Sequence, residues 1–429
     1  MILEKINKED LDTIYTKFDA LYNVYELDEY GSLVNFGKHK SLPFQRWHYY
    51  QEGYSPEILK KIISHLELDN QNITILDPFS GSGSTLVGAQ ALGLNGLGIE
   101  LNPFSFFMSK VKTKDYNTKI LEECVKFKLP EYEQLLDVYG LYELSFIDKL
   151  YSEESLIKIE LIRNKIARLK NQDTKDILFA VLFSILEESS NYKKGGNGLK
   201  KRKKVNNHDV FILFDEKKNQ IIEDLSTKNK TSKINIYNSN VKDIDKIINN
   251  NTIDLSLFSP PYANCFDYFE VYKIELWLGH FVKNYDELKK MRKSALTSNL
   301  NADLKKNIKI ETSSKILSEA MELIDGVELW DKRILKMLVL YFNEMQNLLI
   351  NLRLKLKDNG YVAIVVGNSA YGGIPIATDL ILAEIASNNG YKVKELIVAR
   401  KNETSSQQYS KIGDLVKYIR ETIIILQKC

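Results

Sequence analysis

Residues 73–85 read Ile-Thr-Ile-Leu-Asp-Pro-Phe-Ser-Gly-Ser-Gly-Ser-Thr. The first four residues predict a short buried strand, and the small residues after Asp77 predict a loop whose backbone can approach a ligand closely. An alanine-rich segment ending at Gly93 predicts a helix, and residues 97–99 predict a second strand that ends on Glu100. Strand, glycine loop, helix, strand and terminal acid form the first βαβ unit of a doubly wound α/β sheet.

Further strands with the same character lie downstream of this unit. They are predicted at residues 234–237, 253–258, 361–366, 393–399 and 422–426, and the last two resemble the antiparallel pair that closes such a sheet. The stretches between them are charged and helical in pattern, which indicates insertions into one sheet. The predicted segments are an N-terminal helical segment (1–45), a first sheet segment with the glycine loop (46–112), a helical insertion (113–232), a second sheet segment (233–262), a second helical insertion (263–355) and a third sheet segment (356–429).

The bulk composition limits the classes of protein that the chain can belong to. A length of 429 residues favours two or three cooperating units, and a net charge of +2 means that any nucleic-acid surface must come from local clusters. Three scattered cysteines and five histidines form no metal-ligand spacing, so we expect no metal and a reducing cytoplasm. The longest apolar run, residues 177–186, is too short to span a bilayer.

The glycine loop contains no lysine of the P-loop type, which disfavours ATP as its ligand; for the loop alone, a purely structural turn stays open. Its pattern, Asp-Pro-Phe-x-Gly-Ser-Gly followed by Thr, resembles the cofactor motif of the amino-group DNA methyltransferases of bacterial restriction-modification systems. The resemblance implies a Rossmann-like, doubly wound α/β sheet of seven strands with two helical insertions, and S-adenosyl-L-methionine as cofactor. The residues that it assigns to cofactor binding are Ser55, Pro56, Asp77, Pro78, Phe79, Gly81, Ser82, Gly83, Thr85, Glu100, Leu101 and Asn240.

The family distributes these contacts along the cofactor. The glycine loop holds the methionine moiety, Glu100 accepts hydrogen bonds from the ribose, and the helix start at Ser55-Pro56 helps to hold the cofactor carboxylate. Asn240 stands where the family has an Asp that meets the adenine ring, and this is a departure from the pattern. An Asn side chain both donates and accepts, so the contact can be kept.

A second motif, Ser259-Pro260-Pro261-Tyr262, follows the strand predicted at 253–258, and its four residues are the candidate catalytic residues. An exocyclic amino nitrogen is a poor nucleophile because its lone pair is delocalised into the ring. Two acceptors on its hydrogens would free that lone pair, and the Ser259 hydroxyl and the Pro260 carbonyl are suitable. The prolines hold the carbonyl in a rigid direction, and Tyr262 offers a flat face to a base.

The first residue of this motif predicts the target atom. In the family, Ser is typical of enzymes that methylate cytosine N4, and Asp or Asn of enzymes that methylate adenine N6. We therefore predict methyl transfer to N4 of a cytosine flipped out of double-stranded DNA, with a restriction endonuclease as companion. Adenine N6, an RNA or protein-glutamine substrate, and a catalytically silent protein that keeps the cofactor and binds DNA or a partner stay open. Cys265 is not preceded by Pro, which disfavours cytosine-C5 chemistry.

The most basic stretch, residues 193–204, is the first candidate for DNA contact. Glycines between its lysines predict a flexible loop that follows a phosphate backbone. The candidate contacts are Lys193, Lys194, Lys200, Lys201, Arg202 and Lys203, and a solvated surface loop is the alternative. A second basic patch consists of Lys289, Lys290, Arg292, Lys293, Lys305 and Lys306. The sequence leaves open which of the two insertions reads DNA.

Overall fold

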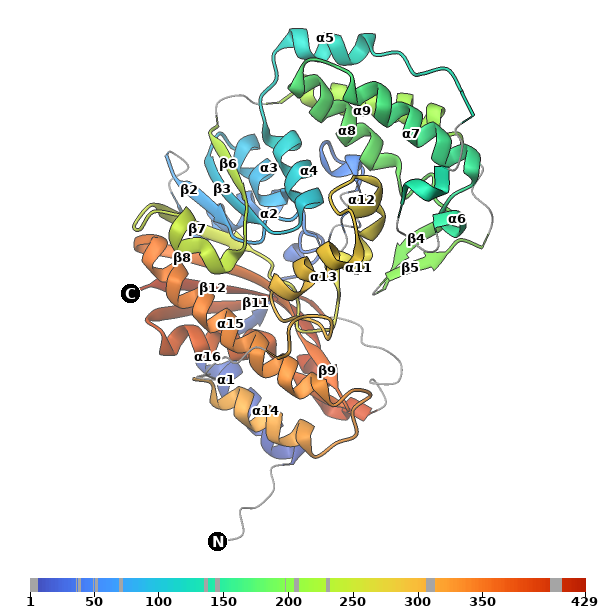
Figure 1. The fold of residues 1–429 in the computed structure, drawn as a ribbon. Helices are drawn as coiled ribbons and strands as arrows, with labels where there is room; N and C mark the ends of the chain where they lie inside the picture. The colour runs from blue at the N-terminus through green and yellow to red at the C-terminus, as the bar shows by residue number, and fades with distance from the viewer. Residues whose placement is uncertain are drawn as a thin grey trace.

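The structure, a computed structural model, describes residues 7–35, 37, 40–48, 50, 53–68, 72–134, 138–142, 147–196, 198–203, 208–228, 232–305, 313–401 and 411–429. Its centre is an eight-stranded sheet with the strand order β1-β11-β12-β8-β7-β2-β3-β6 (Figure 1). The bounds are β1 Val24–Glu26, β2 Thr74–Asp77, β3 Asn95–Glu100, β6 Ile234–Asn238, β7 Ile253–Phe258, β8 Leu356–Gly367, β11 Tyr391–Lys401 and β12 Arg420–Lys428.

Strand β12 is antiparallel to both of its neighbours, and the other pairs in the sheet are parallel. The Rossmann-like α/β sheet and its closing antiparallel pair are confirmed. The predicted number of seven strands is wrong, because residues 24–26 of the N-terminal segment pair in parallel with Leu396–Val398 of β11. A three-residue edge strand shows no alternation that a sequence pattern could reveal.

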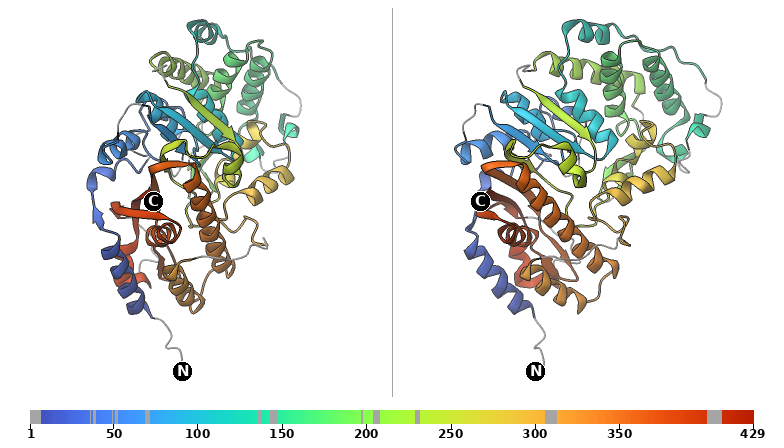
Figure 2. Two further views of the ribbon diagram at one scale, coloured as in Figure 1. Left: turned by 90° about the vertical axis from the view of Figure 1, so that its left-hand side faces the viewer. Right: turned by 60° about the vertical axis from the view of Figure 1, so that its left-hand side comes forward.

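Helices cover both faces of the sheet (Figures 1 and 2). In β8, Val362, Ile364 and Val366 belong to one core cluster, and Ala363 and Val365 belong to another, as the period of two in a strand requires. The first cluster includes residues of α1 (Lys8–Leu21), α14 (Lys315–Asp325), α15 (Arg333–Lys355) and α16 (Thr378–Asn388). The second includes residues of α2 (Glu57–His65) and α3 (Ser84–Ala91).

The first insertion forms a helical lobe beside the sheet (Figures 1 and 2). Its elements are α5 (Thr118–Lys126), α6 (Ile147–Leu150), α7 (Glu153–Ala167), α8 (Gln172–Ile185), β4 (Tyr192–Gly195), β5 (Gly198–Lys201) and α9 (Val210–Ser226). Strands β4 and β5 form an antiparallel hairpin, so the prediction of a flexible loop is wrong for the described residues of this stretch. Asn197 and Lys204–Asn207 lie outside the described residues.

The second insertion is divided between the lobe and the sheet. Its helices α11 (Tyr268–Val271) and α12 (Lys273–Leu278) share a core with the lobe and with α4 (Pro103–Thr113), whereas α14 and α15 pack on the sheet. After α13 (Tyr285–Ser294), the chain lines the pocket at the carboxyl edge of the parallel strands with Ala295, Leu296, Ser298 and Asn299. No described helix is long and apolar enough to cross a membrane.

Candidate active site

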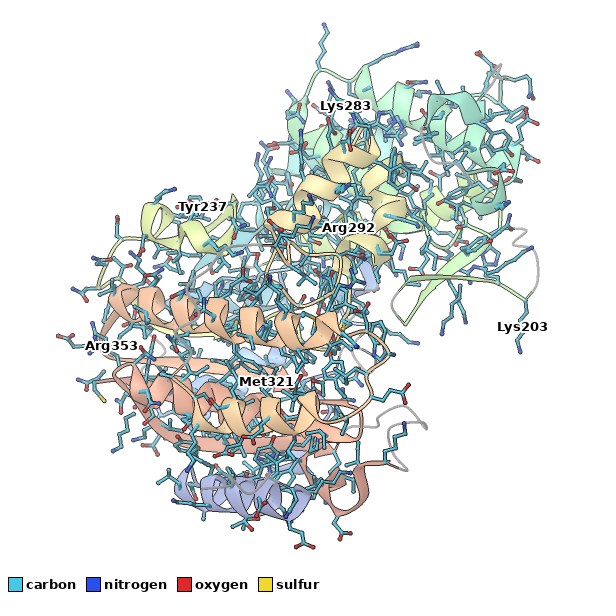
Figure 3. The ribbon with its side chains drawn as sticks, turned by 60° about the horizontal axis from the view of Figure 1, so that its bottom comes forward. Lys203, Tyr237, Lys283, Arg292, Met321 and Arg353 are labelled. Atoms are coloured by element: carbon cyan, nitrogen blue, oxygen red, sulfur yellow. The ribbon has the colours of Figure 1, made fainter. Side chains whose placement is uncertain are left out.

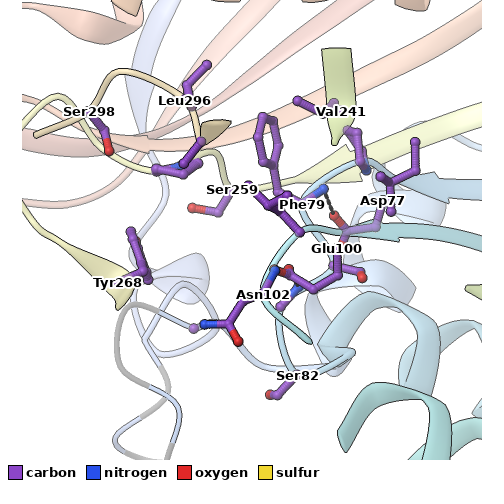
Figure 4. A pocket seen from close by; sticks show the side chains of 18 of the residues that line it. Asp77, Phe79, Ser82, Glu100, Asn102, Val241, Ser259, Tyr268, Leu296 and Ser298 are labelled. Atoms are coloured by element: carbon purple, nitrogen blue, oxygen red, sulfur yellow. Dashed lines mark hydrogen bonds between the residues drawn. The ribbon is translucent and has the colours of Figure 1, made fainter. Parts of the chain in front are cut away.

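A pocket of about 980 Å³, partly open to solvent, lies where β2, β3, β6 and β7 end (Figure 4). The carboxyl ends of parallel strands meet at one edge, which is the usual ligand site of a doubly wound sheet. Ten of the sixteen residues predicted for cofactor binding and catalysis line this pocket: Asp77, Pro78, Phe79, Gly81, Ser82, Glu100, Leu101, Asn240, Ser259 and Pro261. The structure therefore brings the two sequence motifs into one site.

The carboxylate of Glu100 is fixed by two backbone donors. Its Oε2 accepts the N–H of Gly81 and its Oε1 accepts the N–H of Asn102, both at 2.7 Å. Burial raises the pKa of Glu100 to about 7, although these two hydrogen bonds act in the opposite direction. Each oxygen keeps a second lone pair, so the carboxylate can accept two hydroxyl donors from a ligand in the pocket.

Asp77 and Thr85 shape the glycine loop. The Thr85 hydroxyl donates to Oδ2 of Asp77 at 2.6 Å, and the N–H of Phe79 donates to Oδ1 at 3.0 Å. Tyr54 adds a hydrogen bond to the same Oδ2 at 3.2 Å. Burial raises the pKa of Asp77 to about 6. Thr85 is fully buried beneath the loop and does not belong to the pocket wall.

Three buried polar atoms at the pocket have no hydrogen-bond partner within the described part of the chain. They are Oγ of Ser80, Oγ of Ser82 and Nδ2 of Asn102. A buried polar group without a partner costs about 1–3 kcal/mol, so such groups at a pocket indicate a polar ligand. A ligand with hydroxyl, amino and carboxylate groups, such as S-adenosyl-L-methionine, fits these atoms together with Glu100.

Asn240 lines the pocket, and its amide is already used by the protein. Its Nδ2 donates to the carbonyl of Ser294 at 2.7 Å, and its Oδ1 accepts the N–H of Lys242 at 3.0 Å. The side chain therefore joins the loop after β6 to the end of α13. Oδ1 keeps one lone pair for a donor such as an adenine amino group.

The other residues predicted for cofactor binding lie behind the pocket lining and hold the glycine loop in place. The Ser55 hydroxyl accepts the N–H of Glu57 at 3.2 Å at the start of α2, and the Pro56 carbonyl lies against Gly88 of α3. Gly83 has a φ of 91°, and a Cβ there would lie 2.4 Å from Oγ of Ser109. These residues fix the position of the loop and do not line the pocket.

In the catalytic motif, Ser259 and Pro261 line the pocket, whereas Pro260 is buried and outside the lining. Tyr262 is only 8% exposed and also outside it, and its hydroxyl donates to Oε1 of Glu421 at 2.7 Å. Figure 4 shows Ser259 between two ends of the pocket, with Phe79 and Glu100 on one side and Tyr268 and Ser298 on the other.

Several residues of the pocket were not predicted from the sequence. Tyr50 stacks on Tyr272 with ring centroids 4.9 Å apart, and it lies under Gly81 of the glycine loop. Tyr268 and Ser298 lie beyond Ser259 in Figure 4, and Phe269 and Asn299 also line the pocket. An aromatic cluster before the glycine loop was the only sequence signal for Tyr50, and Ser298 and Asn299 had none.

The predicted DNA contacts divide into exposed and buried residues. Lys193, Lys200, Lys201 and Lys203 are exposed, and Figure 3 shows Lys203 pointing outward beside the hairpin. Arg202 donates to the carbonyls of Ser190 and Glu187. The prediction is wrong for Lys194, whose side chain is fully buried, pairs with Glu275 and lies 3.0 Å from Nε2 of His48.

In the second basic patch, Arg292 is paired with Asp267 and Glu270 near the active site, so it is not available as a phosphate contact. The exposed lysines of this patch are Lys289, Lys290, Lys293 and Lys305. Lys306 lies outside the described residues. Among the residues that the structure describes, no group of three or more His, Cys, Asp or Glu could hold a metal ion.

The sheet, the glycine loop and the acid that ends β3 define a class, the S-adenosyl-L-methionine-dependent methyltransferases of Rossmann-like fold. Residues 5–110 match the N6/N4 methyltransferase family model, described as DNA methylase. The chain is 27% identical to the type II methyltransferase M.BsoBI of Geobacillus stearothermophilus, over 92% of this chain and 88% of that protein. It is also 27% identical to M.AvaI of Nostoc sp., over 92% and 89%. The chain is therefore similar to the amino-group (N6/N4) DNA methyltransferases, over residues 5–110 for the family model and over most of its length for these two relatives.

One solved structure superposes only loosely. The rRNA methyltransferase aviRa of Streptomyces viridochromogenes covers 87% of this chain and 85% of its own length at 9% identity, with a TM-score of 0.29. The sequence matches, together with the Rossmann-like sheet and its glycine loop, support an S-adenosyl-L-methionine-dependent DNA methyltransferase.

Proposed function

We propose that the protein transfers the methyl group to N4 of a cytosine that is flipped out of double-stranded DNA. The observation that carries this proposal is the position of Ser259 in the pocket. Ser259 lies between the glycine loop, where the cofactor would bind, and the part of the pocket that contains Tyr268 and Ser298. Ser at this position of the motif is typical of cytosine-N4 enzymes. Asp or Asn, typical of adenine-N6 enzymes, is absent from the motif.

The residues of the motif would act on the amino group. The Ser259 hydroxyl and the Pro260 carbonyl would each accept one N4–H, which localises the nitrogen lone pair. The proton that N4 loses would leave through one of these hydrogen bonds to solvent. S-adenosyl-L-methionine supplies a methyl group on positively charged sulfur, which is an activated electrophile. Asp77, Phe79, Ser82 and Glu100 would hold the cofactor, so that positioning supplies much of the acceleration.

The relatives suggest a setting for the activity. Both are named as type II methyltransferases, and the chain aligns with most of their length. We propose that this protein likewise modifies one recognition sequence, and that a companion endonuclease is blocked by the modification.

Base mapping in DNA from cells that express the protein tests this function. We expect N4-methylcytosine at one sequence, and N6-methyladenine alone would overturn the assignment. With purified protein, Ser259→Ala should lower tritium transfer from S-adenosyl-L-methionine to DNA about 100-fold and leave cofactor affinity unchanged. The control is Ser318→Ala, an exposed serine on α14, which should keep full activity.

A further inference from the structure

Residues 294–299, of which Ala295, Leu296, Ser298 and Asn299 line the pocket, form a wall that is fixed at three points. The Ser294 carbonyl accepts Nδ2 of Asn240 at 2.7 Å, which ties the wall to the cofactor end. The N–H of Thr297 donates to Oε2 of Glu344 at 2.7 Å, and Glu344 is buried in α15. These bonds hold the backbone of the wall in one position at the carboxyl edge of the sheet.

The third point joins the wall to the catalytic loop. The N–H of Cys265 donates to the carbonyl of Ser298 at 3.1 Å, three residues after Tyr262. This bond holds Ser298 and its neighbour Asn299, which both line the pocket, against the loop that carries the catalytic motif.

The two side chains of this wall present donors into the pocket. Ser298 is 2% exposed and Asn299 is 7% exposed, and both line the pocket. Oδ1 of Asn299 accepts the N–H of Asn301 at 2.9 Å, which fixes the orientation of the amide. Within the described part of the chain, neither Nδ2 of Asn299 nor the hydroxyl of Ser298 has a hydrogen-bond partner. An amide on the pocket wall whose two N–H groups are not used by the described part of the chain can donate to a ligand that accepts hydrogen bonds.

The position of this donor pair relative to Ser259 identifies the ligand. Figure 4 shows Ser298 and Tyr268 on the side of Ser259 that faces away from Phe79 and Glu100. A base whose amino group reaches Ser259 must therefore lie in this end, with the rest of its hydrogen-bonding edge along the wall. Tyr268 and Phe269 supply aromatic surface for its ring.

Cytosine matches two adjacent donors better than adenine does. Next to N4, cytosine has the acceptors N3 and O2, whereas adenine has N1 beside N6 and then a C–H group. We propose, on the basis of the cytosine-N4 function above, that Ser298 and Asn299 read the target base by donating to its N3 and O2. They are specificity-determining residues, and they act by direct contact with the substrate.

Asn299→Asp tests the assignment with little change in shape. The carboxylate keeps an acceptor for Asn301 and replaces the free donor by an acceptor, so we expect kcat/KM for DNA to fall about 100-fold and cofactor affinity to stay unchanged. Ser298→Ala should lower kcat/KM about tenfold. The matched control is Asn171→Asp at the start of α8, where the side chain only accepts hydrogen bonds and Asp caps equally well.

A substrate analogue separates base reading from a structural role. In a duplex with 3-deazacytosine at the target position, N3 is replaced by C–H and the amino group remains. The wild type should prefer cytosine to this analogue, and Asn299→Asp or Ser298→Ala should reduce the preference at least tenfold. The inference would be overturned if kcat/KM of both variants stayed within threefold of the wild-type value. It would also be overturned if both variants kept the wild-type preference for cytosine over 3-deazacytosine.

The proposed function fails in a different experiment. If the wild type methylates adenine N6 and not cytosine, base mapping shows this before any variant is made. The proposed contacts of Ser298 and Asn299 with N3 and O2 of cytosine are then wrong as well. If the wild type methylates cytosine N4 and the two variants behave as the wild type does, the function stands and only the role of Ser298 and Asn299 is lost.

Discussion

The phenol of Tyr262 donates a 2.7 Å hydrogen bond to Oε1 of Glu421, and this bond joins the catalytic loop to the last strand of the sheet. Both side chains are buried, and Glu421 also pairs with Arg400. The sequence suggested that Tyr262 offers its face to a base. The structure instead makes its hydroxyl an anchor of the loop that carries Ser259.

Tyr262→Phe should therefore remove the hydrogen bond that anchors the loop and keep the packing of the aromatic ring in the core. We expect the free energy of unfolding in urea to fall by about 1–2 kcal/mol, since a buried acceptor loses its donor. Methyl transfer should fall several-fold with unchanged cofactor affinity. Tyr361→Phe removes a hydroxyl that, among the described residues, takes part in one hydrogen bond, from Gln427, and this variant should have little effect. Full stability and turnover in Tyr262→Phe would show that the bond holds nothing in place.

Cofactor affinity should depend on pH through Glu100. Burial raises the pKa of this carboxyl to about 7, and hydroxyl donors of a ribose favour its charged form. Affinity should therefore rise as pH rises through 7, and the dissociation constant should be about tenfold larger at pH 6 than at pH 8. Calorimetric titrations across this range measure it. Glu100→Gln has no proton to lose and should bind more weakly with a flatter pH profile; a wild-type slope retained in this variant would assign the titration to another group.

The fold was largely predictable because its strands are buried apolar runs. β7 occupies residues 253–258, as the sequence predicted, and the polar residues that follow strands, such as Glu100 and Ser259, converge because parallel strands end at one edge. β1 and the β4–β5 hairpin were not predicted. β1 has three residues, and the hairpin is built from lysine and glycine, which rarely form strands.

The missing portion of the site has a different cause. Ser298 and Asn299 lie far along the chain from Ser259, and the hydrogen bond from Cys265 brings their segment to the pocket. This bond joins two backbone groups, so the types of residue in the sequence do not predict it. Lys193 and Lys194 likewise look equivalent in sequence, and only the pairing of the hairpin separates their faces.

These two adjacent lysines should give opposite phenotypes. Lys193 is exposed on the hairpin, so Lys193→Gln should weaken DNA binding, reduce the slope of log K against log salt by about 0.9, and leave stability unchanged. Lys60→Gln, an exposed charge on α2, is the control. A slope equal to that of the wild type in Lys193→Gln would remove this residue from the DNA surface.

Lys194→Met should act on stability instead. Burial opposes the charge of Glu275, but the cation of Lys194 and the contact with His48 outweigh it and lower the pKa of Glu275 to about 2. Loss of the cation leaves a buried carboxylate without its partner, and we expect the free energy of unfolding to fall by about 3–5 kcal/mol. The salt slope of DNA binding by the folded variant should equal that of the wild type. A reduced slope would mean that Lys194 reaches phosphate.

The close contact between Gly83 and Ser109 allows a prediction in which two substitutions interact. Gly83 has a φ of 91°, and an added Cβ would lie 2.4 Å from Oγ of Ser109, so Gly83→Ala should lose about 2 kcal/mol or more of stability and weaken cofactor binding. That Oγ is buried without a partner in the described part of the chain, so Ser109→Ala alone should be nearly neutral. In the double variant the clash with the hydroxyl is gone and the backbone strain remains, so denaturant unfolding should show partial rescue, with a coupling of about 1 kcal/mol. Strictly additive losses would mean that strain alone, and not the contact with α4, makes glycine necessary at this position.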